Sequence, residues 1–452
     1  MGWVSIAGLL VAHAVLGLLA TTAGRPIVTA HAWATLAVVL WIVVNSRRVE
    51  VFACAAAYVT GAEVFWRMNS ASVPWEVAKY VGIVVFAVGV VRFTGRRVRR
   101  IGVSVAYVAV LTPSVLVTVE RFGLPDALDP ISFNVVAHVA LAAGAVFFTN
   151  LASDRKAVTS VMWVLTAPIL TVNAIAAEST LALDARDFNA GLSNTAASGG
   201  YGPNQVSALF GLAILTCVFL VLFEHRPQLR VLAAVLGCWF LVQGALTLSR
   251  GGLFNVAVAL LVAAPFFMRT ARYAVRVLGA IAVVGFVIVV VLFPLANSIS
   301  GGAFEQRFSS GSTTLRTDLA VEELRQFADA PGFGTGVGLS LRSNPFDDFQ
   351  IPSHTEFSRL LAEHGLLGAV AIVLLVAMAV RGVRDQPLLL GKAFSASCAT
   401  WALAEMMHSA TRLAAVAFVF AFGQVVIRGP GPSPAQAVDR VSGSSSPAPR
   451  SG

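Results

Sequence analysis

Residues 353–368 read SHTEFSRLLAEHGLLG, and they close the longest polar segment of the chain. The stretch runs directly into an apolar segment at 366–380. Ser353 is preceded by Pro352 and followed three residues later by Glu356, a pattern typical of a capping box at a helix N-terminus. The pattern predicts a helix that carries His354 in its first turn and that Gly365 ends or kinks. A polar loop, a histidine and a membrane entry therefore meet within one short stretch.

His354 is the first candidate for chemistry. A histidine at a helix N-terminus lies near the positive end of the helix dipole, which disfavours its charged form. We therefore expect a neutral imidazole that can accept a proton near neutral pH. The alternative is a solvated loop histidine that caps or packs and takes part in no reaction.

The composition predicts the fold class. Of the 452 residues, 57% are hydrophobic and 12% are charged, whereas soluble domains carry about 25% charged residues. Apolar runs of about 18 or more residues recur along the chain, without the alternation of membrane strands. We expect an all-α polytopic integral membrane protein with about 12–14 transmembrane helices. The runs fall at 3–23, 27–45, 49–66, 76–93, 101–119, 131–149, 158–177, 205–223, 229–247, 252–268, 275–296, 366–381, 388–407 and 412–427.

The charge distribution predicts the orientation. The formal net charge is +9, which in a soluble protein would suggest a nucleic-acid partner. Here the arginines lie in every second short connection, as the positive-inside rule expects, so no nucleic acid is expected and both termini should be cytoplasmic. The same parity places three polar segments on the outer face of the membrane, at 178–204, 249–252 and 297–365.

The chain divides into three parts. Residues 1–177 are expected to form N-terminal transmembrane helices, and residues 178–427 a second membrane domain that includes the large outer loop 297–365. Residues 428–452 are rich in Gly, Pro, Ser and Ala, which predicts a disordered cytoplasmic tail. Within the outer loop, 315–329 has the pattern of an amphipathic helix. The glycine-rich run 332–338 that follows would suit either close approach to a ligand or a connector.

Two arginines are candidate anion ligands. Arg250 lies between two apolar runs and is followed by two glycines, which would let helices or a ligand come close. An ionisable group at membrane depth is a functional candidate, although an arginine that snorkels to the interface would look the same. Arg316 falls in the first turn of a predicted helix, where it opposes the dipole. Either an anionic ligand or a neighbouring acidic side chain would favour it there.

Weaker candidates lie elsewhere on the outer side. Arg186 has the acidic neighbours Asp184 and Asp187, so a local ion pair is the better interpretation, with substrate binding as the alternative. His408 and Arg412 lie in the last outer turn and would face the same cleft. The spans also contain histidines that we expect to be packed and hydrogen-bonded, namely His13, His31 and His138. No metal-ligand cluster stands out, and no metal or other cofactor is expected.

Outward arginines combined with a neutral histidine suit a phosphate-bearing substrate. Arginine binds and neutralises a diphosphate, bidentately where the geometry allows. Histidine can take the proton from an attacking hydroxyl, with the diphosphate as leaving group.

At these residues the sequence resembles the superfamily of O-antigen ligases and O-antigen polymerases, which are glycosyltransferases of the bacterial envelope. The ligase pattern is a histidine, a polar residue, nine residues, a glycine, two residues and a small or hydroxyl residue. His354-Thr355, Gly365 and Gly368 fit this pattern, with Thr355 keeping a hydroxyl but lacking the family's amide. Further pieces of the resemblance, which covers roughly 180–410, are Ser249-Arg250-Gly251, Arg316, the run 332–338 and Gly202-Pro203-Asn204.

The resemblance implies an all-helical, glycosyltransferase-C-like membrane fold. The donor would be a glycan on a polyprenyl diphosphate, transferred outside the cytoplasmic membrane without nucleotide sugar or metal. Arg250 and Arg316 would bind the diphosphate, His354 would be the base, and Asn204 would contribute to substrate binding. The other partners would be the lipid bilayer and a glycan, lipid or protein acceptor, with inversion at the anomeric carbon.

Three readings remain open at this point. A ligase and a polymerase differ only in acceptor, which the sequence does not reveal. A transporter or flippase of lipid-linked or anionic envelope precursors would share the spans and arginines, but it favours polar residues midway through several spans. A structural subunit of an envelope assembly would tolerate loss of His354 and Arg250.

Overall fold

A computed structural model describes residues 2–93, 98, 101–269, 274–275, 285, 288–309, 316–340, 355–408 and 411–429. The chain is an all-helical, polytopic membrane protein, as predicted. Within the described ranges, ten segments are long and apolar enough to cross a membrane. They are α1 (Trp3–Ala23), α2 (Arg25–Asn45), α3 (Val49–Met68), α5 with α6 (Gly102–Phe122), α7 (Leu124–Thr149), α8 (Arg155–Leu181), α9 (Pro203–Phe223), α10 (Pro227–Leu246), α11 (Arg250–Met268) and α17 (Leu366–Arg384).

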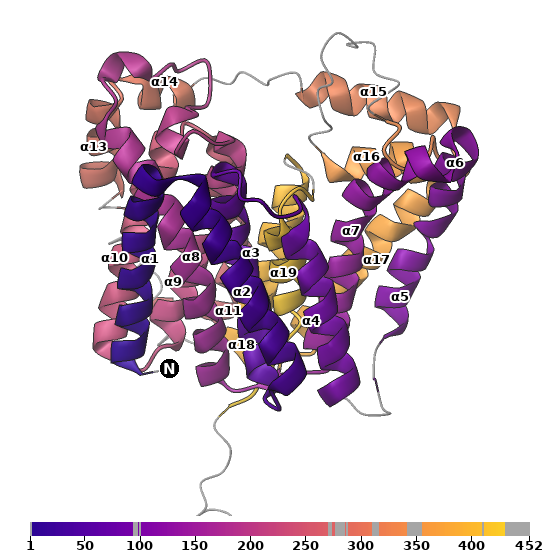
Figure 1. Cartoon of the computed structure of the whole chain (residues 1–452), viewed down its shortest axis with the longest axis horizontal. Coiled ribbons are helices and arrows are strands. Elements are labelled where there is room, and N and C mark those ends of the chain that lie inside the picture. The colour runs from indigo at the N-terminus through magenta and orange to yellow at the C-terminus, as the bar shows by residue number, and fades with distance from the viewer. Residues whose placement is uncertain are drawn as a thin grey trace, which may run out of the picture.

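The remaining elements are shorter. Helices α4 (Val77–Phe93), α18 (Leu389–Met406) and α19 (Ala414–Phe422) complete the bundle. The strands β1 (Ala152–Ser153) and β2 (Val426–Ile427) form a parallel pair that was not expected from the sequence. The other short helices are η1 (Ala185–Asp187), η2 (Ala196–Ser198), η3 (Ile288–Leu292), α13 (Phe293–Ile299), α14 (Ala303–Ser309), α15 (Arg316–Asp329) and α16 (Glu356–His364). Helices α13 to α16 gather at one end of the bundle, opposite the N-terminus (Figure 1).

Small residues allow the inner helices to pack closely. A Cβ built on Gly17 of α1 would lie 2.8 Å from the Thr171 carbonyl oxygen of α8, and one on Gly61 of α3 would lie 2.6 Å from the Leu165 carbonyl oxygen. Such close contacts are typical of helix pairs in lipid, where packing has to replace the hydrophobic effect. One cluster of buried apolar side chains extends from Ile6 to Ile427, so early and late parts of the chain share a core.

The predicted membrane span at 412–427 is wrong. Helix α19 covers only Ala414–Phe422, about 14 Å at the usual rise per residue, whereas a bilayer core is ~30 Å thick. All nine of its residues are buried, and Figure 1 shows the helix in the middle of the bundle, between α3 and α7. Its apolar sequence therefore reflects burial in protein and not contact with lipid.

Two other predicted spans need comment. The span at 101–119 is broken into α5 (Gly102–Ala109) and α6 (Thr112–Phe122), with Pro113 at the start of the second helix, where proline disfavours continuation of the first. The span at 275–296 lies largely outside the described residues, as does the predicted tail apart from 428–429.

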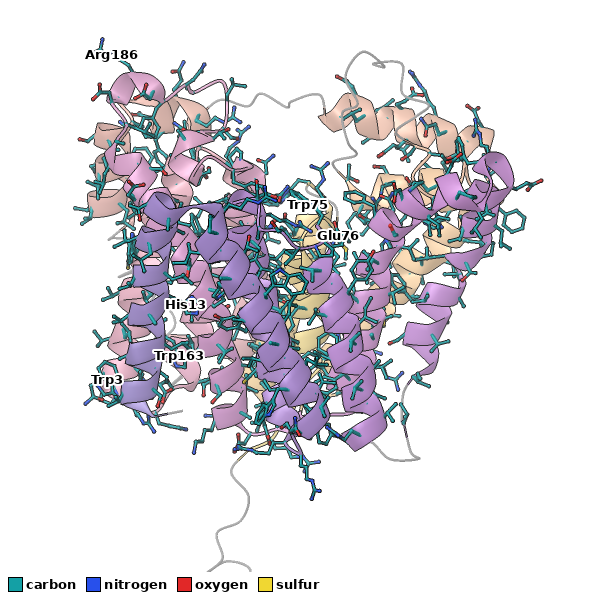
Figure 2. The ribbon with its side chains drawn as sticks, viewed as in Figure 1. Trp3, His13, Trp75, Glu76, Trp163 and Arg186 are labelled. Atoms are coloured by element: carbon teal, nitrogen blue, oxygen red, sulfur yellow. The ribbon has the colours of Figure 1, made fainter. Side chains whose placement is uncertain are left out.

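The intramembrane histidines are packed and hydrogen-bonded, as expected. His13 Nδ1 lies 2.8 Å from Thr171 Oγ1, and Figure 2 shows His13 within the bundle. His31 Nδ1 accepts a hydrogen bond from the Trp66 indole at 3.0 Å, so its Nε2 carries the proton and donates to the Tyr58 hydroxyl at 2.8 Å. Both histidines therefore link helices of the bundle, His13 joining α1 to α8 and His31 joining α2 to α3. His138 instead contacts Glu356.

Candidate functional site

The first half of the site forms where three helix ends meet. Asn204, at the start of α9, accepts a hydrogen bond from the Ser249 hydroxyl at 2.8 Å. Ser249 is the N-cap residue of α11, whose first residue is Arg250. His408, just after α18, lies so close that a Cβ on Gly251 would be 2.7 Å from its ring carbon Cε1. The structure therefore brings together the predicted residues Asn204, Arg250 and His408.

The turn that carries Arg250 is tightly constrained. Leu248 has a φ of 52°, a left-handed conformation that is uncommon for a branched side chain. Ser207 of α9 ties the turn together, because its hydroxyl donates to the Ser249 carbonyl at 2.8 Å and accepts from the Gly252 N–H at 3.3 Å. A Cβ on Gly252 would lie 1.8 Å from the Ser207 carbonyl oxygen. The glycine predicted to allow close approach therefore serves a helix–helix contact.

Gly252→Ala is accordingly expected to destabilise the folded protein by roughly 3 kcal/mol, because the methyl group would clash with backbone and not with a flexible side chain. The measurement is thermal unfolding of the purified protein in detergent, together with its level in membranes. Gly8→Ala on α1 is the matched control, since nothing lies within 4 Å of a Cβ there. Equal stability of the two variants would contradict the proposed contact.

A second arginine supports the first. Arg250 is half-buried, and its Nη1 donates to the Arg307 carbonyl at 3.5 Å. Arg307 of α14 is buried, with Nε donating to the Leu248 carbonyl at 3.3 Å and Nη1 to the Gly191 carbonyl at 3.0 Å. Arg307 thus fastens α14 and the loop after η1 onto the Arg250 turn. The sequence analysis did not identify Arg307, because the residue does not lie in a recognisable motif.

Arg186 does not join this group. It lies exposed on η1, and Figure 2 shows it projecting from the outermost part of the molecule. Among the described side chains, Arg186 forms no ion pair with Asp184 or Asp187, contrary to the prediction. Instead, Asp184 and Asp187 form a capping box around η1, with the Asp187 carboxylate accepting from the Asp184 N–H at 2.8 Å.

His408 is oriented by two buried polar side chains. Asn255 of α11 donates from Nδ2 to the Glu405 carboxylate at 2.6 Å, so its Oδ1 is left to accept from His408 Nε2 at 2.8 Å. Glu405 and Asn255 are fully buried. The sequence signal for both was a polar residue within an apolar run, but neither was singled out.

The second half of the site is built on α16, which begins differently from the prediction. Thr355 is the N-cap residue, with its hydroxyl accepting from the Ser358 N–H at 3.2 Å, and Glu356 is the first helical residue. The predicted capping box is therefore wrong, because the Glu356 carboxylate is buried and engaged elsewhere. His354 precedes the helix and lies outside the described residues. Gly365 ends the helix with a φ of 61°, as predicted.

Glu356 is the centre of a buried network. Its Oε1 lies 3.0 Å from His138 Nε2 of α7 and 2.5 Å from Arg359 Nη2, and the Tyr107 hydroxyl of α5 lies 2.7 Å from His138 Nδ1. Its Oε2 accepts from the N–H and hydroxyl of Thr411, at 2.9 and 3.1 Å. Burial alone would raise the pKa of the Glu356 carboxyl, but Arg359 and His138 outweigh it and hold that pKa well below its usual range.

The other end of α16 carries Glu363, whose carboxyl has a raised pKa, in contrast to the lowered pKa of Glu356. Glu363 is buried and accepts a hydrogen bond from the Ser340 hydroxyl at 2.9 Å. Burial raises the pKa of Glu363 to about 7. The charge of Arg359 and the hydrogen bonds from the Gly338 N–H and the Ser340 hydroxyl act in the other direction and offset only part of this increase. The carboxyl therefore changes charge near neutral pH.

This raised pKa predicts a pH dependence of stability. The folded protein holds the Glu363 proton up to about pH 7, whereas the unfolded chain releases it near the ordinary value of 4.5, so the folded state loses stability as pH rises through this window. We expect the unfolding temperature of the wild type to fall relative to that of Glu363→Gln between about pH 5 and pH 8. The variant has no ionisable group at position 363. The pH effects of all other groups are therefore common to the two proteins and cancel in the difference between their unfolding temperatures. A temperature difference that stays constant with pH would refute the assignment.

The glycine-rich run is a packed connection. Gly334, Gly336 and Gly338 have φ values of 75°, 101° and 72°, which only glycine adopts readily. The Thr335 and Gly336 N–H groups donate to the Ala362 and Glu363 carbonyls at 2.9 and 3.2 Å. Of the two predicted uses, these contacts favour the connector, which holds α16 in place.

Helix α15 packs against α16. It spans Arg316–Asp329, which confirms the predicted helix at 315–329. Glu323 of this helix hydrogen-bonds to the Ser358 hydroxyl of α16, so the two helices are fixed to each other. Arg316 is the first residue of α15, and its side chain lies outside the described part of the structure.

The turn after α18 connects the two halves. Thr411 contacts Glu356, and the next residue, Arg412, is half-buried with its carbonyl accepting from Arg67 Nη1 at 3.0 Å. His408, in the same connection, contacts the Arg250 turn. In the ranges that the structure describes, no three His, Cys, Asp or Glu side chains are grouped so as to hold a metal ion.

Comparison with known proteins adds one match. Residues 232–373 match the family model described as O-antigen ligase, and no curated protein matches the chain. The matched range contains Arg250, Arg316 and His354, while Asn204 and His408 lie outside it. The match covers most of α10, all of α11 with the Arg250 turn, helices α13 to α16 and the start of α17. This polytopic membrane protein therefore carries a domain of the O-antigen ligase family at residues 232–373.

Proposed function

We propose that the protein is a membrane glycosyltransferase that moves a glycan from a polyprenyl-diphosphate carrier to an acceptor hydroxyl on the outer face of the bacterial cytoplasmic membrane. The family match supports the reaction class. The observation that carries the proposal is the meeting of Asn204, the Arg250 turn and His408 at the ends of α9, α11 and α18, joined through Thr411 to the start of α16. Helices α15 and α16 lie at one end of the bundle, where a lipid-borne substrate would present its diphosphate (Figure 1).

In this proposal each residue has one role. Arg250 and Arg316 bind the diphosphate and neutralise the charge that develops on it as it leaves. The acceptor hydroxyl oxygen attacks the anomeric carbon while the bond from that carbon to the diphosphate oxygen breaks. His354 takes the hydroxyl proton, so the products are the elongated acceptor and the polyprenyl diphosphate. Direct attack inverts the anomeric configuration.

The proposal is tested by complementation of a deletion strain with the wild type and Arg250→Ala, with membrane levels measured in parallel. We expect the variant to lose the surface glycan and to accumulate the lipid-linked precursor on the outer face. Restoration of the glycan by the variant would contradict the role of Arg250. A precursor that accumulates on the cytoplasmic face would favour a flippase instead.

The same strain separates the two acceptor classes. A polymerase uses a second lipid-linked glycan, so its loss leaves a single repeat unit on the final acceptor. Loss of a ligase leaves full-length glycan on the lipid carrier. The length distribution of the lipid-linked glycan therefore distinguishes the two activities.

A further inference from the structure

Two buried carboxylates hold the connection between α18 and α19 from opposite sides. Glu356 Oε2 accepts from the Thr411 N–H at 2.9 Å, and Glu63 Oε2 of α3 accepts from the Ala414 N–H at 2.7 Å. Both carboxylates are buried. The only two residues between these contacts are Arg412 and Leu413, so buried carboxyl groups hold the backbone N–H groups on either side of Arg412.

The second carboxylate belongs to a group of buried charges that the proposed reaction does not use. Arg67 Nη2 lies 2.8 Å from Glu63 Oε1 and 3.2 Å from Glu76 Oε1, and Lys79 Nζ lies 2.5 Å from Glu76 Oε2. Figure 2 shows Glu76 near the end of the bundle that carries helices α13 to α16 in Figure 1. Arg67 reaches the same turn, because its Nη1 donates to the Arg412 carbonyl at 3.0 Å.

Such a group is not explained by stability alone. Burying ion pairs requires desolvation that their mutual attraction barely offsets, and apolar replacements are often as stable. Here, however, two of the four charged side chains make hydrogen bonds to the same short backbone segment, Arg67 to the Arg412 carbonyl and Glu63 to the Ala414 N–H. This is the arrangement expected where the position of a single backbone segment has to be fixed.

We propose that Glu63 and Glu356 are positioning residues for Arg412, and that Arg412, which lies in the same connection as His408, is a third cationic residue for the lipid-linked diphosphate. The role of Arg412 rests on the proposed function. The positioning itself does not, because it follows from contacts between Glu63, Arg67, Glu356 and the turn.

The test is a double-mutant cycle on the full-length protein in lipid nanodiscs, with KM for the lipid-linked glycan donor and kcat measured separately. Arg412→Ala is expected to raise KM about tenfold or more with kcat nearly unchanged, since it removes a charged hydrogen-bond donor. Glu63→Ala should raise KM in the same direction. Because both act through one residue, the variant carrying both substitutions should be no worse than Arg412→Ala alone.

Two further variants separate positioning from loss of structure. Glu63→Gln keeps an oxygen that accepts from the Ala414 N–H, so it should retain most of the wild-type affinity. Thr171→Val removes a buried hydrogen bond to His13 that touches neither the turn nor its carboxylates, and it should leave KM unchanged. If Glu63→Ala does not reach the membrane, Thr411→Val, which removes only the hydroxyl contact to Glu356, replaces it in the cycle.

Each outcome decides between the parts of the proposal. Additive effects of Glu63→Ala and Arg412→Ala on KM would overturn the positioning role, and an unchanged KM in Arg412→Ala would overturn the diphosphate contact while leaving the transferase proposal intact. If the wild type transfers no glycan, the proposed function fails. The same cycle is then measured as affinity for polyprenyl diphosphate, where additivity again counts against positioning.

Discussion

Replacing His354 by alanine is expected to lower kcat for glycan transfer by about 10²–10⁴-fold, with little change in KM for the lipid-linked donor. This is the range typical of a lost general base, because the acceptor hydroxyl must then lose its proton without a positioned partner. The measurement is initial-rate kinetics of the purified protein in nanodiscs at saturating donor.

His225→Ala is the matched control for this experiment. His225 lies exposed in the connection between α9 and α10, beyond the end of α9 opposite Asn204. Its replacement should leave kcat unchanged. A His354→Ala variant with wild-type kcat would remove His354 from the reaction, whatever the other residues do.

Replacing Glu356 by alanine is expected to destabilise the folded protein by about 3–5 kcal/mol, the usual range for breaking a buried ion pair from one side. The substitution would remove the carboxylate that lies 2.5 Å from the buried Arg359 guanidinium. It would also remove the contacts of that carboxylate with His138 and Thr411. The measurement is thermal or denaturant unfolding in detergent. Glu356→Gln keeps two hydrogen-bonding atoms and should fall between alanine and the wild type.

An exposed ion pair provides the comparison. Glu322 and Arg325 of α15 lie 3.4 Å apart, with the arginine side chain 72% exposed. Such pairs contribute at most about 1 kcal/mol, so Glu322→Ala should be close to the wild type. If Glu356→Ala is equally mild, the buried network does not hold α16 in place.

The helical membrane fold could be predicted from the sequence because lipid requires long apolar helices, and most spans were found within a few residues. The error at 412–427 has a physical cause. An apolar run indicates burial but does not say whether lipid or protein covers it, and α19 is covered by α3, α7 and α18. The division of 101–119 into α5 and α6 could have been read from Pro113.

The candidate site was predictable in part. The glycines after Arg250 indicated close packing, which the contact between Gly252 and Ser207 confirms. The capping box predicted at Glu356 was wrong. A glutamate three residues after a serine is typical of a capping box, but the sequence pattern does not show that a buried histidine and arginine bind this carboxylate instead. The contacts of Glu356 with His138 and of Glu63 with Ala414 join residues far apart in the chain. No local pattern in the sequence reports such contacts.

The central claim is that the Arg250 turn serves glycan transfer from a lipid-linked diphosphate. The most direct measurement compares purified wild type with Arg250→Ala and Arg230→Ala in nanodiscs that contain lipid-linked glycan and acceptor but no nucleotide sugar. Arg230, whose Nε donates to the Glu224 carbonyl near the start of α10, is the control. We expect the wild type and Arg230→Ala to form product of inverted anomeric configuration, and Arg250→Ala to lose at least about 10²-fold in rate. Transfer by Arg250→Ala at the wild-type rate, or no transfer by the wild type, would contradict the claim.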